Sequence, residues 1–179
     1  MINVIEGGTA VFLARQVWPS LAPLRVESRR ADSAWQTRAV IDIDEFMSGC
    51  RPAVRGLVGQ FGGAEAALEF DTDPLSAVGV LDGYVQRLPL DEFEAEDWIA
   101  LHTDLSAFVT VVLLETYGGA CRARLDDALP TGWELVVDVV GSDARHRVIA
   151  PMSLGYEYLV PVPQRIPRLM EAVAHQVTG

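Results

Sequence analysis

The chain has 179 residues, of which 50% are hydrophobic and 22% charged, so it can form the core of one ordinary domain and is not a disordered chain. All 14 basic residues are arginine, which excludes mechanisms that need a lysine amine, such as Schiff-base formation or a Walker A phosphate loop. The 25 acidic residues leave a net charge of −11, which repels nucleic acid and anionic membranes. We therefore expect neither of these as a partner.

The composition also bears on where the protein works. Its bias toward alanine, valine, glycine, aspartate and arginine is typical of a GC-rich genome and indicates a bacterial source. Cys50 and Cys121 are too few for a disulfide framework, and the sequence leaves open whether they lie close together. The first residues lack the charged and then apolar stretches of a secretory signal. We expect a cytoplasmic protein with reduced thiols.

Proline and glycine punctuate the first half of the chain. The residue types predict a short helix stopped by Pro19, a strand, a second short helix ended by Gly62-Gly63 and a second strand, over Thr9–Trp18, Trp35–Ile43, Pro52–Phe61 and Ala67–Asp71. Asp73 followed by Pro74 is a typical helix start. Apolar residues at helical spacing then predict a helix from Leu75 to Leu88.

A long apolar stretch marks the middle of the fold. Thr103 or Asp104 is expected to cap a helix over about 104–126. Between Leu105 and Leu114 this helix is apolar on nearly every face, which predicts burial on every face. It should be the central element of the protein.

The last third predicts an antiparallel hairpin over Trp133–Ala150. The strand Trp133–Val140 and the strand Arg145–Ala150 are joined by turn residues, with a loop of two or four residues. Either loop pairs odd positions of the first strand with even positions of the second, and places Asp138 opposite an arginine. Tyr156–Val160 is a candidate third strand, and an amphipathic helix follows Pro163. We predict one α+β domain over 1–179, with this sheet packed on helices.

The second half also carries a resemblance. An apolar helix is followed by Tyr117-Gly118-Gly119, then Arg122, and then Gly132-Trp133 at the start of the hairpin. This order resembles small uncharacterised bacterial domains of unknown function. The resemblance covers the C-terminal half and implies no activity.

Two groups of residues are candidate metal ligands. His102 and Asp104 have the HxD form of some metal sites, but two ligands at this spacing are a weak signal, and a helix cap is the simpler interpretation. Asp42, Asp44 and Glu45 close a predicted strand and would need a further carboxylate such as Asp71 or Asp73 to hold Mg²⁺. The simpler interpretation is a polar exit from the strand. We expect no metal and no cofactor.

A catalytic pocket built from dispersed residues is the second possibility. Cys121 with His146 or His102 is a candidate thiol–imidazole pair, although an ordinary buried cysteine is the more economical interpretation. Glu115 ends the apolar stretch two turns before Arg122, which predicts either a pocket acid or a structural ion pair. The alternative pocket therefore consists of Glu115, Arg122, His102 and His146.

The strongest charge feature is an acidic run with aromatic neighbours. Five carboxylates fall within seven residues, and two aromatic side chains lie among or next to them: Asp91, Glu92, Phe93, Glu94, Glu96, Asp97 and Trp98. Such a run is usually a solvated helix start, but apolar anchors beside charge are also typical of protein interfaces. We expect a non-enzymatic partner protein, of the immunity or accessory type, that binds another, basic protein or a second copy of itself. A small cofactor-independent or metal-assisted enzyme is the alternative.

Overall fold

The computed structural model describes residues 43–126, 133–159 and 165–179, which form an α+β fold. In chain order the helices and strands are α2 (Ile43–Thr72), the 3-10 helix η1 (Pro74–Ala77), α3 (Val78–Val85), the 3-10 helix η2 (Leu90–Glu92), α4 (Ala95–Tyr117), β1 (Ala120–Leu125), β2 (Trp133–Val140), β3 (His146–Ile149), α5 (Pro151–Leu159) and α6 (Ile166–Thr178). The predicted helix over Thr9–Trp18 and all but the last residue of the predicted strand Trp35–Ile43 lie outside the described residues.

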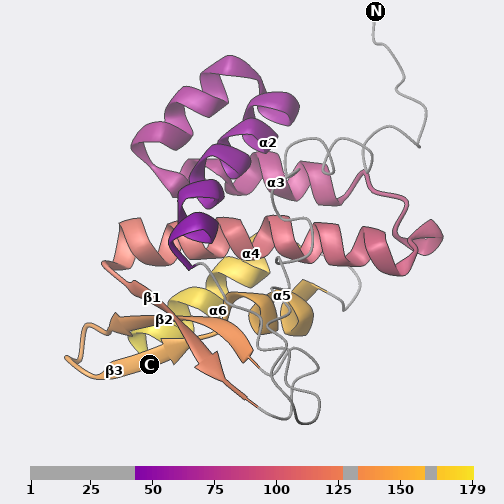
Figure 1. Ribbon diagram of the computed structural model, residues 1–179. Helices are drawn as coiled ribbons and strands as arrows, with labels where there is room; N and C mark the ends of the chain where they lie inside the picture. The colour runs from indigo at the N-terminus through magenta and orange to yellow at the C-terminus, as the bar shows by residue number, and fades with distance from the viewer. Residues whose placement is uncertain (1–42, 127–132, 160–164) are drawn as a thin grey trace, which may run out of the picture.

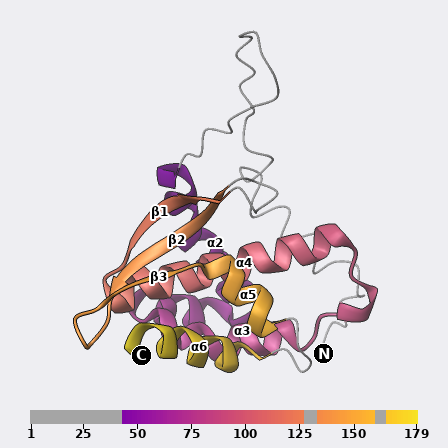
Figure 2. The ribbon, with the colours of Figure 1, turned by 90° about the horizontal axis from the view of Figure 1, so that it is seen from below.

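Helix α4 is the central element, as its apolar stretch predicted. Figure 1 shows it crossing the middle of the molecule, with α2 and α3 on one side and the sheet, α5 and α6 on the other. Phe108 faces the core shared with α2 and α3, and Leu113 faces the core shared with the sheet and α6; both side chains are fully buried. Seen from below, the sheet also lies against one end of α4 (Figure 2).

The composition and length of α4 would also suit a membrane span. It is the one helix in the described part of the chain that is long and apolar enough, and 67% of its most apolar window is buried inside the protein. Packing within the fold therefore accounts for its apolar surface.

The bounds of α4 differ from the prediction at both ends. The helix begins nine residues before Asp104, because the acidic run itself provides its first turn and cap. It ends at Tyr117 rather than near Asp126, because Gly118 adopts a left-handed backbone with φ of 65°. Gly119 then lies so close to the sheet that a Cβ there would be 2.5 Å from Cγ1 of Val137. The following residues become strand β1.

The sheet has three antiparallel strands in the order β1-β2-β3. The hairpin of β2 and β3 is confirmed, but its loop has five residues because Val140 pairs with His146. Odd positions therefore pair with odd positions, so Asp138 lies opposite Val148 and not opposite an arginine. The third strand is β1 and not Tyr156–Val160, whose described residues belong to helix α5.

Helix α2 is a hairpin of two helical segments. Its kink falls at Gly63, where φ is 88°, so the predicted glycine stop is correct. The expected strand Ala67–Asp71 is wrong, because this segment is helical and buries Ala67 and Phe70 against the first segment and α4. The short predicted helix over Pro52–Phe61 is present within a longer one.

The C-terminal amphipathic helix is confirmed as α6. Its buried positions include Ile166, Leu169 and Val173. Asp82 of α3 lies at its first turn, where its carboxylate accepts hydrogen bonds from the Ile166 N–H at 2.9 Å and from Nε of Arg165 at 3.0 Å. The hydrogen bond to Ile166 joins α3 and α6 across 84 residues of sequence.

Candidate protein-binding surface

The acidic segment, residues 91–97, forms η2 and the first turn of α4. Glu94 is the N-cap of α4, and its side chain accepts a hydrogen bond from the backbone of Asp97. In return the Glu94 backbone N–H donates to the Asp97 carboxylate at 3.1 Å. This reciprocal pair is a capping box, and it gives two of the five carboxylates a structural role. The helix-start interpretation is therefore correct for Glu94 and Asp97.

The other carboxylates of the segment face solvent. Asp91, Glu92 and Glu96 are exposed, and none of them forms an ion pair with an arginine that the structure describes. Glu96 lies in the first turn of α4, where a negative charge is favoured by the helix dipole. Asp91 and Glu92 lie in η2, before α4, and neither carboxylate forms a hydrogen bond or an ion pair with another described residue.

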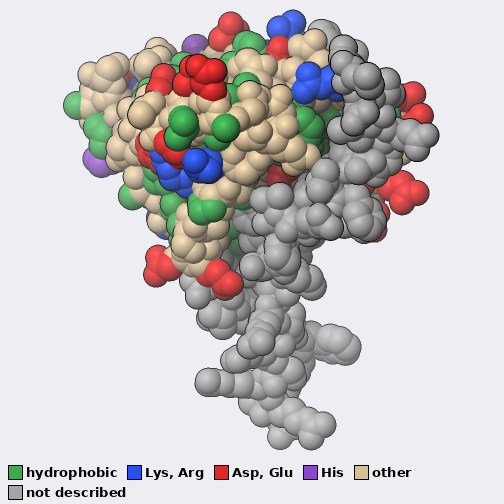
Figure 3. All heavy atoms as spheres, turned by 90° about the horizontal axis from the view of Figure 1, so that it is seen from above, with side chains coloured by type: hydrophobic (Ala, Val, Ile, Leu, Met, Phe, Trp, Pro, Cys, Tyr) green, Lys and Arg blue, Asp and Glu red, His purple; other side chains and the backbone are tan. Residues whose placement is uncertain are grey.

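The arginines are used elsewhere. Within the described ranges, every arginine except Arg87 and Arg168 forms an ion pair with a carboxylate of the same chain. The space-filling view over α2 and α3 shows basic side chains directly beside acidic ones (Figure 3). Among the described residues, the acidic segment thus has no arginine partner, whereas most of the described arginines are paired with carboxylates.

Four rings form a continuous aromatic row that starts in the acidic segment. The rings of Phe93 and Trp98 meet edge to face with 5.2 Å between centroids. Trp98 lies 5.7 Å from His102 at an interplanar angle of 26°, and His102 stacks on Tyr156 at 3.9 Å and 25°. The helical spacing of Trp98 and His102 places them one turn apart on α4, whereas Tyr156 comes from α5.

His102 is the buried member of the aromatic row. Its side chain is 1% exposed, and neither ring nitrogen forms a hydrogen bond of ordinary geometry. Burial lowers the pKa of His102, and the nearby backbone carbonyl of Trp98 opposes this shift only in part. The imidazole is therefore held neutral at pH 7. His102 is not a capping-turn residue, and Asp104 is not a cap, because both lie inside α4.

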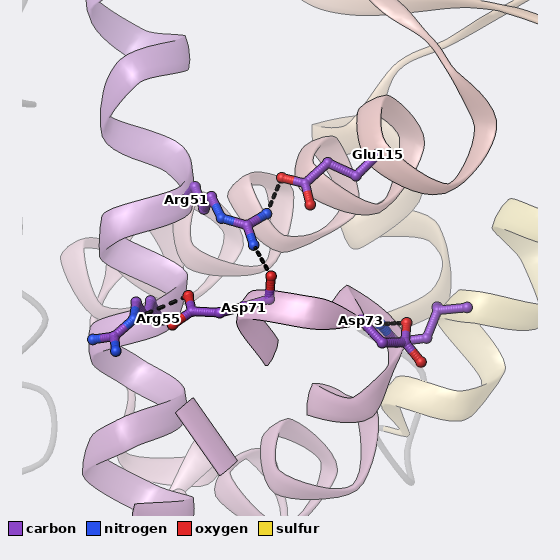
Figure 4. A network of polar contacts seen from close by, with 6 residues as sticks. Arg51, Arg55, Asp71, Asp73 and Glu115 are labelled. Carbon is purple, nitrogen blue, oxygen red and sulfur yellow. Dashed lines mark hydrogen bonds and ion pairs between the residues drawn. The ribbon is translucent and has the colours of Figure 1, made fainter. Parts of the chain in front are cut away.

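Glu115 does not pair with Arg122. Its carboxylate accepts a hydrogen bond from Arg51 of α2, whose guanidinium also donates to the backbone carbonyl of Asp71 at 2.8 Å. Arg55 in turn pairs with the Asp71 carboxylate at 2.8 Å. Figure 4 shows Arg51 between Glu115 and Asp71, so the network joins both segments of α2 to the end of α4. The charged side chains of this network therefore have partners within the fold, and their role is structural.

Arg122 and His146 lie on the outer face of the sheet, which also carries Asp138. Arg122 donates to the Asp138 carboxylate at 2.5 Å, and this bond is the largest cause of the lowered pKa of Asp138. The charge of His146 lowers the same pKa slightly, which places it close to Asp138. Of the four residues of the alternative pocket, the structure therefore brings together only Arg122 and His146.

The two cysteines are near one another across α2 and β1. Burial, with a smaller contribution from the charge of Cys121, raises the pKa of Cys50 to about 12. Burial, with a smaller contribution from the charge of Asp138, raises the pKa of Cys121 to about 11. Both thiols stay protonated at neutral pH. Cys121 lies opposite Val137 on the inner face of the sheet, whereas His146 projects from the outer face, so the candidate thiol–imidazole pair is not formed.

The carboxylates that were weighed as Mg²⁺ ligands do not converge. Asp44 and Glu45 lie in the first turn of α2, and Asp42 lies outside the described residues. Asp71 pairs with Arg55, and Asp73 caps η1 by accepting from the Leu75 N–H at 2.9 Å. In the described part of the chain no three His, Cys, Asp or Glu side chains are grouped as a metal site would require.

Tyr156 is the surface residue that sequence reasoning missed. The sequence predicts a strand here, whereas Tyr156 lies in α5, stacks its ring on His102 and is 50% exposed as a residue. The only available signal was the pairing of Trp98 and His102 at helical spacing, which did not indicate a partner from α5.

Comparisons with known proteins add no assignment, since no family model, no curated protein and no solved structure matches the chain.

Proposed function

We propose that the protein is a non-enzymatic, cytoplasmic binding factor, of the immunity or accessory type, which docks a basic protein through its acidic segment. The observation that carries the proposal is the set of exposed carboxylates Asp91, Glu92 and Glu96, which form no ion pair with a described arginine, whereas seven of the nine described arginines are paired within the fold. Unpaired charge of one sign at the surface accelerates encounter with a partner of opposite sign.

The aromatic rings next to the acidic segment supply apolar surface that can be buried against a partner. Phe93 is half-buried within the acidic segment, Trp98 is half-buried directly after it, and Ile99 is 59% exposed on the next position of α4. Partly exposed aromatic and aliphatic side chains act as anchors in interfaces, because their burial contributes affinity that solvated charge pairs do not. The acidic segment therefore combines steering charge with anchors.

The test removes charge without disturbing the fold. The variant Asp91→Asn, Glu92→Gln, Glu96→Gln leaves the Glu94–Asp97 capping box intact. The matched control Glu65→Gln, Glu69→Gln, Glu171→Gln removes the same charge from exposed positions of α2 and α6. The partner is first captured from lysate of the source organism and identified, and its association rate is then measured at low and high salt.

Comparing the two variants distinguishes an effect of charge in the acidic segment from an effect of the total net charge. The proposal predicts slower association and a weaker salt dependence for the segment variant, with little change for the control. Equal effects of both variants would mean that only total charge matters. Unchanged kinetics in the segment variant would make residues 91–97 ordinary surface.

The enzyme alternative is less well supported. Glu115 and Arg122 each have a separate structural partner, and His102 is enclosed between two rings. Cys121 and His146 lie on opposite faces of the sheet, so these two residues do not form the thiol–imidazole pair that such a pocket needs.

A further inference from the structure

We propose that the aromatic row receives an arginine side chain of the basic partner, whose guanidinium stacks on the open face of Tyr156. Other basic residues of the same partner then meet the carboxylates of the acidic segment. The inference rests on the proposed function, because it specifies the partner chemistry for that same surface.

The geometry of the row leaves one ring face available. One face of the Tyr156 ring stacks on His102, and the residue is 50% exposed, so we infer that solvent reaches the opposite face of the ring. His102 is backed by Trp98, and Trp98 by Phe93, so the exposed ring rests on a packed support. A supported ring loses little conformational entropy when it binds, which favours its use as an anchor.

The neutral state of the row suits a cation. A planar ring attracts a cation placed over its face, and a charged imidazole directly behind the ring would oppose this attraction. His102 is buried, makes no hydrogen bond of ordinary geometry at either ring nitrogen, and stays neutral at pH 7. The three stacked rings therefore present an uncharged π surface beside a strongly negative segment.

Arginine fits this surface better than lysine does. Its guanidinium is planar and weakly hydrated, so it stacks on an aromatic face and still donates hydrogen bonds at its edge to carboxylates. A lysine ammonium is a compact and strongly hydrated charge that gains less from a flat ring. Seven of the nine arginines that the structure describes already pair with carboxylates of this chain, and the proposal takes its arginine from another protein.

The experiment compares two short synthetic peptides, one of alternating glycine and arginine and one of alternating glycine and lysine with the same length and charge. Their affinities for the full-length protein are measured by calorimetry at low salt. We expect the arginine peptide to bind about three-fold to ten-fold more tightly than the lysine peptide. Tyr156→Leu should abolish this preference, and Tyr156→Phe, which keeps the ring, should retain it.

The outcomes separate this inference from the proposed function. Equal affinities for both peptides, or a preference that survives Tyr156→Leu, would overturn the arginine platform. In that case, weaker binding of both peptides to the segment variant would still support the acidic surface. If neither peptide binds at low salt, both proposals are wrong. If the free protein self-associates and Tyr156→Leu abolishes this, the occupant is a second copy of the chain, and the basic partner is wrong.

Discussion

The carboxylate of Asp82 accepts a hydrogen bond from the backbone N–H of Ile166, at 2.9 Å, across 84 residues of sequence. The same carboxylate accepts from Nε of Arg165 and from Nε2 of Gln86, and Asp82 is 7% exposed. It therefore satisfies the first turn of α6 from outside that helix and holds α6 against α3. The last helix depends on this contact as well as on its apolar face.

The Asp82 contact predicts a graded loss of stability. Asp82→Ala leaves a buried N–H without an acceptor and should lower the free energy of unfolding by about 2–4 kcal/mol. Asp82→Asn should cost less, because its amide oxygen can still accept from Ile166. Urea denaturation of both variants measures the difference, with Asp91→Ala as an exposed control. Equal, small effects of all three substitutions would contradict the role of Asp82.

The central position of α4 predicts strong sensitivity to buried charge. Leu113 is fully buried, whereas Thr116 is exposed on the same helix. Leu113→Asp should prevent soluble folding, because a lone buried charge costs several kcal/mol against a total stability of about 5–15 kcal/mol. Val112→Asp should do the same, since Val112 is 1% exposed. The control Thr116→Asp should fold. Circular dichroism and thermal melting measure the folding of all three variants. If Val112→Asp and Leu113→Asp are soluble and melt close to the wild-type temperature, α4 is not the central element.

The turn after α4 predicts a difference between two glycines. A Cβ at Gly119 would lie 2.5 Å from Val137 and 3.1 Å from the Leu113 carbonyl oxygen, whereas a Cβ at Gly79 would meet nothing within 4 Å. Gly119→Ala should therefore lower the free energy of unfolding by about 1–3 kcal/mol. Gly79→Ala, inside α3, should raise it by about 0.5–1 kcal/mol. Thermal melts of the two variants should shift in opposite directions.

The buried imidazole predicts a specific acid sensitivity. Burial lowers the pKa of His102 in the folded state, so the unfolded state binds its proton more tightly. Stability linked to His102 is complete above the unfolded value of about 6.5 and is lost as pH falls through the lower folded pKa. His102→Phe keeps the stack and should remove this part of the acid destabilisation. Unfolding free energies between pH 7.5 and pH 5 measure it, with the exposed His146→Phe as control; identical pH profiles for His102→Phe and the wild type would contradict it.

Several elements were predictable from local patterns. The apolar run Leu105–Leu114 predicted a central helix, because a continuous apolar run of this length suits a buried helix better than a strand. The alternation in Trp133–Val140 predicted a strand, because only a strand places alternate residues on one face. The helical spacing after Pro163 predicted α6 in the same way. The acidic segment was also recognised from the sequence, since density of charge needs no tertiary information.

Tertiary contacts decided the rest. Ala67–Asp71 has a strand-like pattern but is helical, because Phe70 packs against the core of α2 and α4. A five-residue loop changed which residues face each other across the hairpin, because side chains alternate and one extra residue reverses the pairing. The aromatic row could not be inferred, because Tyr156 reaches His102 only once α5 packs on α4. The sequence by itself therefore determined the central helix, the hairpin and the charge of the surface, whereas only the packing of separate helices decided which rings lie beside that charge.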